Sequence, residues 1–264
     1  MIGPLTDPVA HGGDAADAFH VVCPSLPGYG FSAKPSAPGW GLTRIAAAWV
    51  QLMHGLGYER FFAAGGDWGG LLTSTMGQQH AHALDGIHLN HMVGNRAALL
   101  AVPDPTAEER AQIDAFDTYA AWENGYSQQQ ATRPQTVGYG LTDSPLGQCA
   151  WILEKFWAWT DCGGHPENAL SRDRMLDNIS LYWLTATAAS SARLYWESLK
   201  TVFANATQVG VPTAYSVFPG ERFARLRYTD LRYYNVLEKG GHFAAMEQPE
   251  LYVEEVSASL AVRP

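Results

Sequence analysis

The fold of this chain is decided by one short stretch, Gly65-Gly66-Asp67-Trp68-Gly69, which has the form small-x-acid-x-small. It follows an apolar run at 60–64 and precedes a helical pattern that continues to about His80. Glycines in such a stretch permit a sharp turn between a strand and a helix, with the central side chain projecting over the sheet edge. A carboxylate at the centre would attack an alkyl carbon and form an ester. The stretch alone is equally compatible with a plain turn in which Asp67 caps the next helix.

Short apolar runs alternate with helical patterns on both sides of this stretch. A run at 18–23 stops at a loop rich in proline and glycine, and a run at 86–90 follows the helix that ends near His80. Between 43 and 57, apolar residues recur at intervals of three and four, from a Thr43 cap to a terminal Gly57. Because strands that alternate with helices form parallel sheets, we predict an α/β fold with a mostly parallel sheet.

The middle of the chain shows helical signals only. Thr106 and Glu109 form a capping box, and Ser144 precedes a proline suited to the first helical position. Strand patterns and a last helix then return, at 212–218, 231–237 and 249–262. We therefore predict a core interrupted by an inserted helical cap, with the first part of the core at 1–93, the cap at 94–208 and the second part of the core at 209–264.

Composition excludes several classes of function. Seventeen Lys and Arg against 26 Asp and Glu give a formal net charge of −9, which argues against a nucleic-acid partner. The three cysteines lack metal-ligand spacing and are odd in number, so we expect a reducing, cytoplasmic location. No apolar run approaches the roughly 18 residues that a membrane span needs. We expect no membrane association, no metal and no cofactor, and we leave a homo-oligomer open.

Two further polar residues follow predicted strands. His242, in Lys-Gly-Gly-His-Phe, comes after the strand at 231–237, and Glu221 comes after the strand at 212–218. Since ligands bind at the carboxyl ends of parallel strands, both could meet Asp67 there. An imidazole can deprotonate water near neutral pH, and a carboxylate behind it would fix its tautomer and stabilise its positive charge. Asp230 is the rival for that acidic role.

The chain order of nucleophile, acid and histidine is that of α/β-hydrolases. Five segments in this order together resemble the microsomal-type epoxide hydrolases: Pro-Ser-Leu-Pro-Gly-Tyr-Gly-Phe-Ser at 24–32, the stretch at 65–69, Leu-Thr-Asp-Ser-Pro-Leu-Gly at 141–147, Trp-Ile-Leu-Glu-Lys-Phe at 151–156 and Gly-Gly-His-Phe-Ala-Ala at 240–245. The resemblance implies that a small apolar epoxide and water are the substrates. It implies that Asp67 opens the epoxide to a covalent ester, and that water activated by His242, with Glu221 behind it, cleaves that ester to a diol.

The resemblance also assigns residues outside the predicted core. Two tyrosines of the cap, Tyr126 and Tyr195, match the family's proton donors to the epoxide oxygen. A phenol suits this task because its reference pKa near 10 keeps it protonated at neutral pH. Trp68, directly after the nucleophile, is a candidate for oxyanion or substrate contact.

One feature of that family has no counterpart here. The family's His-Gly-x-Pro loop helps to form the oxyanion hole, whereas the His-Gly pairs at 11–12 and 54–55 lack the proline. By resemblance, this loop and three early strands would lie upstream of Met1, and one of those strands would run between 18–23 and 60–65. Two alternatives stay open: a haloalkane dehalogenase-like hydrolase, which also has tryptophan after its aspartate, and a catalytically impaired fragment.

Overall fold

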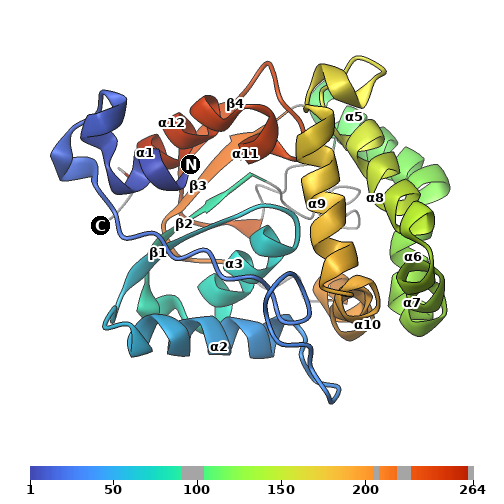
Figure 1. Ribbon diagram of the computed structural model, residues 1–264. Coiled ribbons are helices and arrows are strands. Elements are labelled where there is room, and N and C mark those ends of the chain that lie inside the picture. The colour runs from blue at the N-terminus through green and yellow to red at the C-terminus, as the bar shows by residue number, and fades with distance from the viewer. Residues whose placement is uncertain (91–103, 205–207, 219–226, 261–264) are drawn as a thin grey trace.

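The computed structural model describes residues 1–90, 104–204, 208–218 and 227–260 (Figure 1). Within these residues, four parallel strands form one sheet in the order β1-β2-β3-β4. The strands are β1 (Phe61–Gly65), β2 (Leu84–Leu89), β3 (Thr213–Val217) and β4 (Leu231–Val236). Each overlaps a strand that the sequence pattern predicts, and the α/β-hydrolase prediction of a mostly parallel sheet is confirmed.

Helices cover both faces of this sheet (Figure 1). Ile87 and Leu89 of β2 are fully buried in the main core, against α2 (Leu42–Gly55) and α3 (Asp67–Gln79). The residue between them, His88, points to the opposite face and meets Tyr252 of α12 (Pro249–Ser259). This alternation follows from the two-residue period of a strand.

The face under α12 holds a buried polar network. Glu255 of α12 accepts hydrogen bonds from Ser216 of β3 (2.6 Å) and from Tyr233 and Asn235 of β4 (2.9 and 2.7 Å). Ser216 Oγ also lies 2.9 Å from His88 Nε2. Because the serine hydroxyl gives its proton to the carboxylate, His88 must donate from Nε2. The network therefore ties the last helix to three strands.

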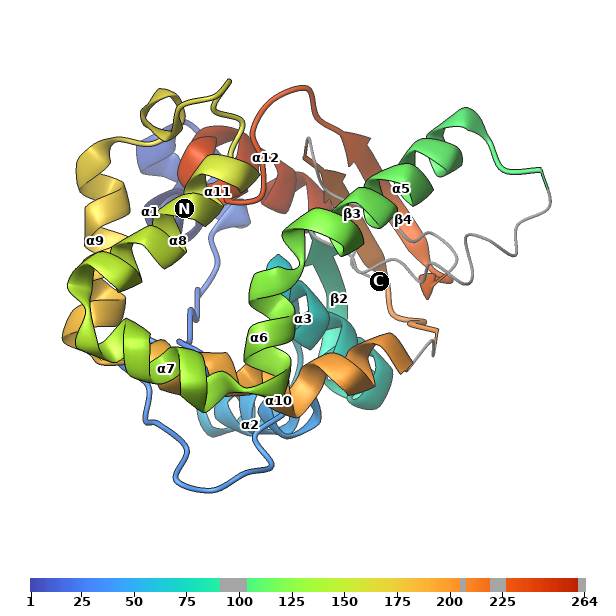
Figure 2. The same cartoon turned by 90° about the vertical axis from the view of Figure 1, so that its right-hand side faces the viewer.

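Helices alone occupy the described chain between β2 and β3, as the sequence pattern predicts (Figure 1, Figure 2). They are α5 (Ala107–Thr118), a π-helical turn (Tyr119–Glu123), α6 (Gly125–Thr132), α7 (Pro134–Asp143), α8 (Pro145–Trp159), α9 (Arg172–Leu184) and α10 (Ala188–Ala204). Ser144 caps α8 by accepting from the Gly147 amide at 3.0 Å. α10 packs against α6 and α7 in this layer and also reaches α2 of the core. The described residues also form short helical pieces: α1 (Ile2–Thr6), α11 (Ala244–Glu247) and 3₁₀ turns at Pro8–His11, Ala15–Asp17, Ala81–Ala83 and Pro166–Asn168.

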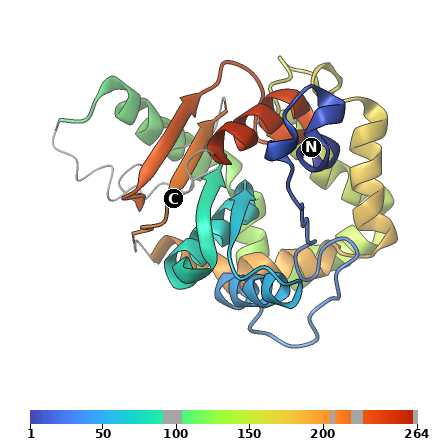
Figure 3. The same cartoon turned by 90° about the vertical axis from the view of Figure 1, so that its left-hand side faces the viewer.

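Two local predictions were wrong. The segment 18–23 is extended but belongs to no sheet, and it passes beside β1 as a separate trace (Figure 3). A cavity of about 790 Å³, lined by residues of both segments, lies along the edge of β1 that has no neighbouring strand in the described chain. A strand needs another strand within backbone hydrogen-bonding distance, and 18–23 pairs with none of the described strands. Thr43 does not cap α2, because that helix begins one residue earlier and the Leu42 amide donates to Ser198 Oγ at 3.2 Å.

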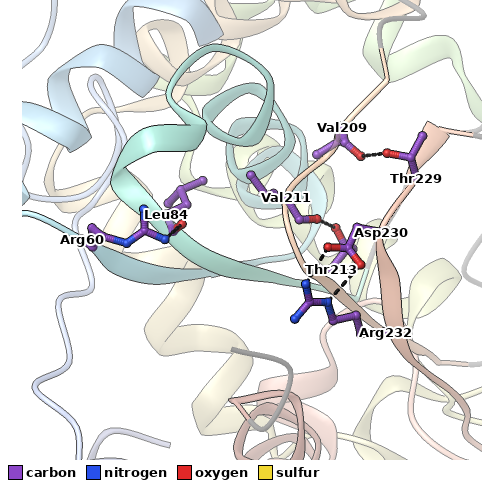
Figure 4. A network of polar contacts seen from close by, with 8 residues as sticks. All are labelled: Arg60, Leu84, Val209, Val211, Thr213, Thr229, Asp230 and Arg232. Atoms are coloured by element: carbon purple, nitrogen blue, oxygen red, sulfur yellow. Dashed lines mark hydrogen bonds and ion pairs between the residues drawn. The ribbon is translucent and has the colours of Figure 1, made fainter. Parts of the chain in front are cut away.

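The amino ends of the strands are held by polar contacts (Figure 4). Arg60 donates to the carbonyl of Leu84 at 2.6 Å and to Asp85 at 2.6 Å, which joins the start of β1 to that of β2. Asp230, at the start of β4, pairs with Arg232 at 2.9 Å. The described helices include none that is both long and apolar enough to cross a bilayer.

Candidate active site

Asp67 stands at a sharp turn between β1 and α3. Its φ of +48° lies in the left-handed region, which costs a non-glycine residue about 1–3 kcal/mol. The preceding glycines allow close approach: a Cβ on Gly65 would lie 2.4 Å from the carbonyl of Gly69, and a Cβ on Gly66 would lie 2.5 Å from Asn90 Oδ1. The turn therefore holds the carboxylate at the carboxyl end of β1, with half of the Asp67 side chain still exposed (50%).

His242 meets this carboxylate from the loop after β4. Its Nε2 lies 3.3 Å from Asp67 Oδ2, although 175 positions separate the two residues in the chain. Only 13% of the His242 side chain is exposed. The carboxyl ends of β1 and β4 lie at the same edge of a parallel sheet, which is why the loops that follow them converge. The predicted encounter of Asp67 and His242 is found in the structure.

The two predicted cap tyrosines face the same carboxylate. Tyr126 comes from α6 and Tyr195 from α10, and their ring centroids are 6.0 Å apart. Burial raises the pKa of both phenols; neighbouring tyrosines and Asp67 raise the pKa of Tyr126 further, and the charge of Asp67 raises that of Tyr195. Both hydroxyls therefore stay protonated through the neutral range and can donate. Trp68 is buried, and its ring meets Tyr195 edge-on at 4.8 Å.

Sequence reasoning missed several side chains around these tyrosines. The Tyr119 hydroxyl lies 3.2 Å from that of Tyr126, and the Lys155 ammonium lies 4.2 Å from the centre of the Tyr126 ring. Trp159 stands between Tyr126 and His242, with ring centroids 5.2 and 5.0 Å away. The spacing of seven residues between Tyr119 and Tyr126, two helical turns, was the available signal.

Two carboxylates, Glu221 and Asp230, were candidates for the acid partner of His242. Glu221 lies outside the described residues, which stop at Phe218, one residue after the end of β3. Its rival Asp230 is found at the amino end of β4, where it binds Arg232, at the opposite end of that strand from the His242 loop. Asp230 is therefore excluded from this role.

Nothing in the described part of the chain suggests a metal centre. No group of three or more His, Cys, Asp or Glu side chains there has the arrangement to hold a metal ion. Cys23, Cys149 and Cys162 are free thiols. The chemistry available at the described site is that of a carboxylate, an imidazole and phenols.

Known proteins share this sequence and architecture. The family model of the α/β hydrolase fold matches residues 12–159. A "Putative epoxide hydrolase" of Stigmatella aurantiaca (strain DW4/3-1) is 52% identical over 264 aligned residues, covering 97% of this chain and 59% of that protein. "Epoxide hydrolase 1" of Sus scrofa is 37% identical, covering 96% of this chain and 62% of that protein. The chain thus spans about three fifths of the length of these relatives.

A solved structure of an epoxide hydrolase also resembles this chain. Juvenile hormone epoxide hydrolase from the silkworm Bombyx mori superposes with a TM-score of 0.79 at 34% identity, over 90% of this chain and 62% of that one. The family model alone covers more than half of the chain. The chain therefore belongs to the α/β-hydrolase family, within which it is similar to epoxide hydrolases.

Proposed function

We propose that this chain hydrolyses epoxides to vicinal diols through a covalent ester on Asp67. The observation that carries the proposal is the distance of 3.3 Å between Asp67 and His242 beneath two protonated cap tyrosines. A carboxylate nucleophile, a base beside it and phenolic donors opposite are the groups that this reaction requires. Residues 94–208 serve as the cap that supplies the donors, and residues 1–93 and 209–264 serve as the core.

In the first step, an Asp67 carboxylate oxygen attacks an epoxide carbon and the carbon–oxygen bond of the ring breaks. The oxygen that leaves the carbon takes a proton from Tyr126 or Tyr195. Donation at the moment when negative charge develops lowers the barrier more than it stabilises the bound epoxide. The product of this step is a hydroxyalkyl ester of Asp67.

In the second step, His242 Nε2 takes a proton from water, and the resulting hydroxide attacks the ester carbonyl of Asp67. The carbon–oxygen bond between the acyl carbon and the diol then breaks, and the diol oxygen takes the proton held by His242. The proton of the new Asp67 carboxyl returns to the tyrosine that gave its own in the first step, which restores the carboxylate and the phenol. Glu221 would stabilise the charged imidazole, and the Trp68 amide, in the first turn of α3, would face the oxyanion. That amide is available because the first N–H groups of a helix have no partner within it.

The substrate is expected to be apolar. Aromatic side chains line the described site: Trp68 packs on Tyr195, and Trp159 packs on His242. The silkworm relative is named a juvenile hormone epoxide hydrolase, which supports an epoxide as the substrate of this chain. The free cysteines are consistent with a cytoplasmic location.

Isotope labelling tests the covalent route. With enzyme in excess over an aryl epoxide in oxygen-18 water, one turnover should place the label in the peptide that contains Asp67 and leave the diol unlabelled. Direct attack of water on the epoxide would instead label the diol at once, and this result would refute the proposal. An Asp67→Ala variant should form no diol, whereas Asp173→Asn, which changes an exposed aspartate of α9, should keep wild-type turnover.

Chloride release from a haloalkane at a rate equal to epoxide opening would favour a dehalogenase.

A further inference from the structure

The loop that carries His242 is fastened to the end of cap helix α8. The His242 amide donates to the carbonyl of Trp159 at 2.9 Å, and the Gly240 amide donates to Asp161 Oδ2 at 3.1 Å. Met246 of α11, the short helix after His242, packs against the apolar cluster that contains Phe156 of α8. The cap and the core thus meet through the backbone of a predicted catalytic residue.

Glu247 completes this junction from the core side. Its Oε1 accepts from the Phe243 amide at 3.0 Å, and its Oε2 accepts from the Asp161 amide at 2.8 Å. One oxygen therefore holds the residue after His242, and the other holds the cap. Burial of the Glu247 carboxyl raises its pKa above the usual value.

The two segments approach too closely for side chains at the contact point. A Cβ on Gly241 would lie 2.6 Å from the Trp159 carbonyl and 3.0 Å from the Asp161 amide. An aromatic contact also joins the His242 loop to α8: Phe243 packs on Phe156 with ring centroids 4.9 Å apart. The His242 loop is thus pressed onto the cap, with its imidazole Nε2 facing Asp67.

We propose that Glu247 and Asp161 form a clamp that positions His242 by holding its loop against the cap. Both side chains accept hydrogen bonds from backbone amides, and through these they act on the position of the loop. This inference rests on the proposed function. Because Asp67 is presented by a different loop, the clamp should matter for hydrolysis of the ester and not for its formation.

Hydrogen exchange tests the clamp independently of activity. Glu247→Gln keeps the side chain's size but leaves one oxygen, so one of the two amides loses its acceptor. Amides in peptides covering 159–161 and 240–243 should exchange faster in Glu247→Gln and Asp161→Ala. They should exchange at wild-type rates in Asp161→Asn, which keeps an acceptor, and in the matched control Glu250→Gln, an exposed glutamate of α12. Unchanged exchange in Glu247→Gln would overturn the clamp.

Rapid mixing with an aryl epoxide, followed by intact-protein mass measurement, tests the consequence. Glu247→Gln should form the ester at the wild-type rate and hydrolyse it about 10²-fold more slowly, the loss typical of a base displaced by about 1 Å. The ester should therefore accumulate, as it should in His242→Ala. If His242→Ala accumulates no ester, the proposed function fails. If His242→Ala accumulates it and Glu247→Gln does not, or if both steps slow equally, the clamp fails.

Discussion

The stability of this fold should fall in mild acid because of one buried histidine. His88 has no exposed surface, and its Nδ1 has no hydrogen-bond partner within the described residues. Burial lowers its pKa from 6.5 to about 4. Between these values the unfolded chain binds a proton that the folded chain does not. The free energy of unfolding is therefore at its full value above about pH 6.5 and decreases as the pH falls toward 4.

The size of this loss follows from the pKa values. A pKa unit corresponds to about 1.36 kcal/mol, so the loss approaches about 3 kcal/mol at pH 4 and is about 2 kcal/mol at pH 5. Replacing His88 by glutamine removes the titration and keeps a donor for Ser216. The variant's absolute stability is not the readout, because only the change with pH isolates the imidazole.

The measurement is urea unfolding of both proteins at pH 7.5 and pH 5.0. Carboxylates contribute equally to both and cancel in the comparison, so the wild type should lose about 2 kcal/mol more than His88→Gln. His54→Gln, which removes an exposed imidazole from α2, is the matched control and should follow the wild type. Equal losses in the wild type and His88→Gln would refute the reasoning, since the His88 imidazole would then bind protons equally well in the folded and the unfolded chain.

Other predictions concern the turn and the phenols. Gly65→Ala places a Cβ 2.4 Å from backbone and should lower stability by about 3 kcal/mol or more, whereas Gly140→Ala, with open space around it, should not lower the melting temperature. Tyr195→Phe and Tyr126→Phe should each slow ester formation by about 10²-fold in rapid mixing, and equal rates in wild type and both variants would exclude them as donors. Tyr119→Phe removes a hydrogen bond of about 1 kcal/mol to Tyr126 and should slow the same step by about fivefold, a smaller loss than either donor variant.

Much of the site was predictable because of where parallel strands end. Asp67 and His242 each follow a strand pattern, and this alone indicates that they share an edge of the sheet. The cap tyrosines were predictable only through the resemblance, because nothing in their local sequence separates Tyr126 or Tyr195 from the other tyrosines. Asp230 also stands next to a strand pattern, but it precedes its strand, and the fold therefore places it at the wrong end.

By itself, the sequence determined the elements and their order, because apolar spacing specifies strands and helices locally. The glycines at 65–66 likewise specify a tight turn in which no larger residue would fit. Only the tertiary structure decided which elements meet. The segment 18–23 has a strand pattern but pairs with no strand in the described chain, and Glu247 of the core accepts a hydrogen bond from the Asp161 amide of the cap, 86 positions away. The physical reason is that hydrogen bonds between distant segments depend on distances in space, which no local pattern encodes.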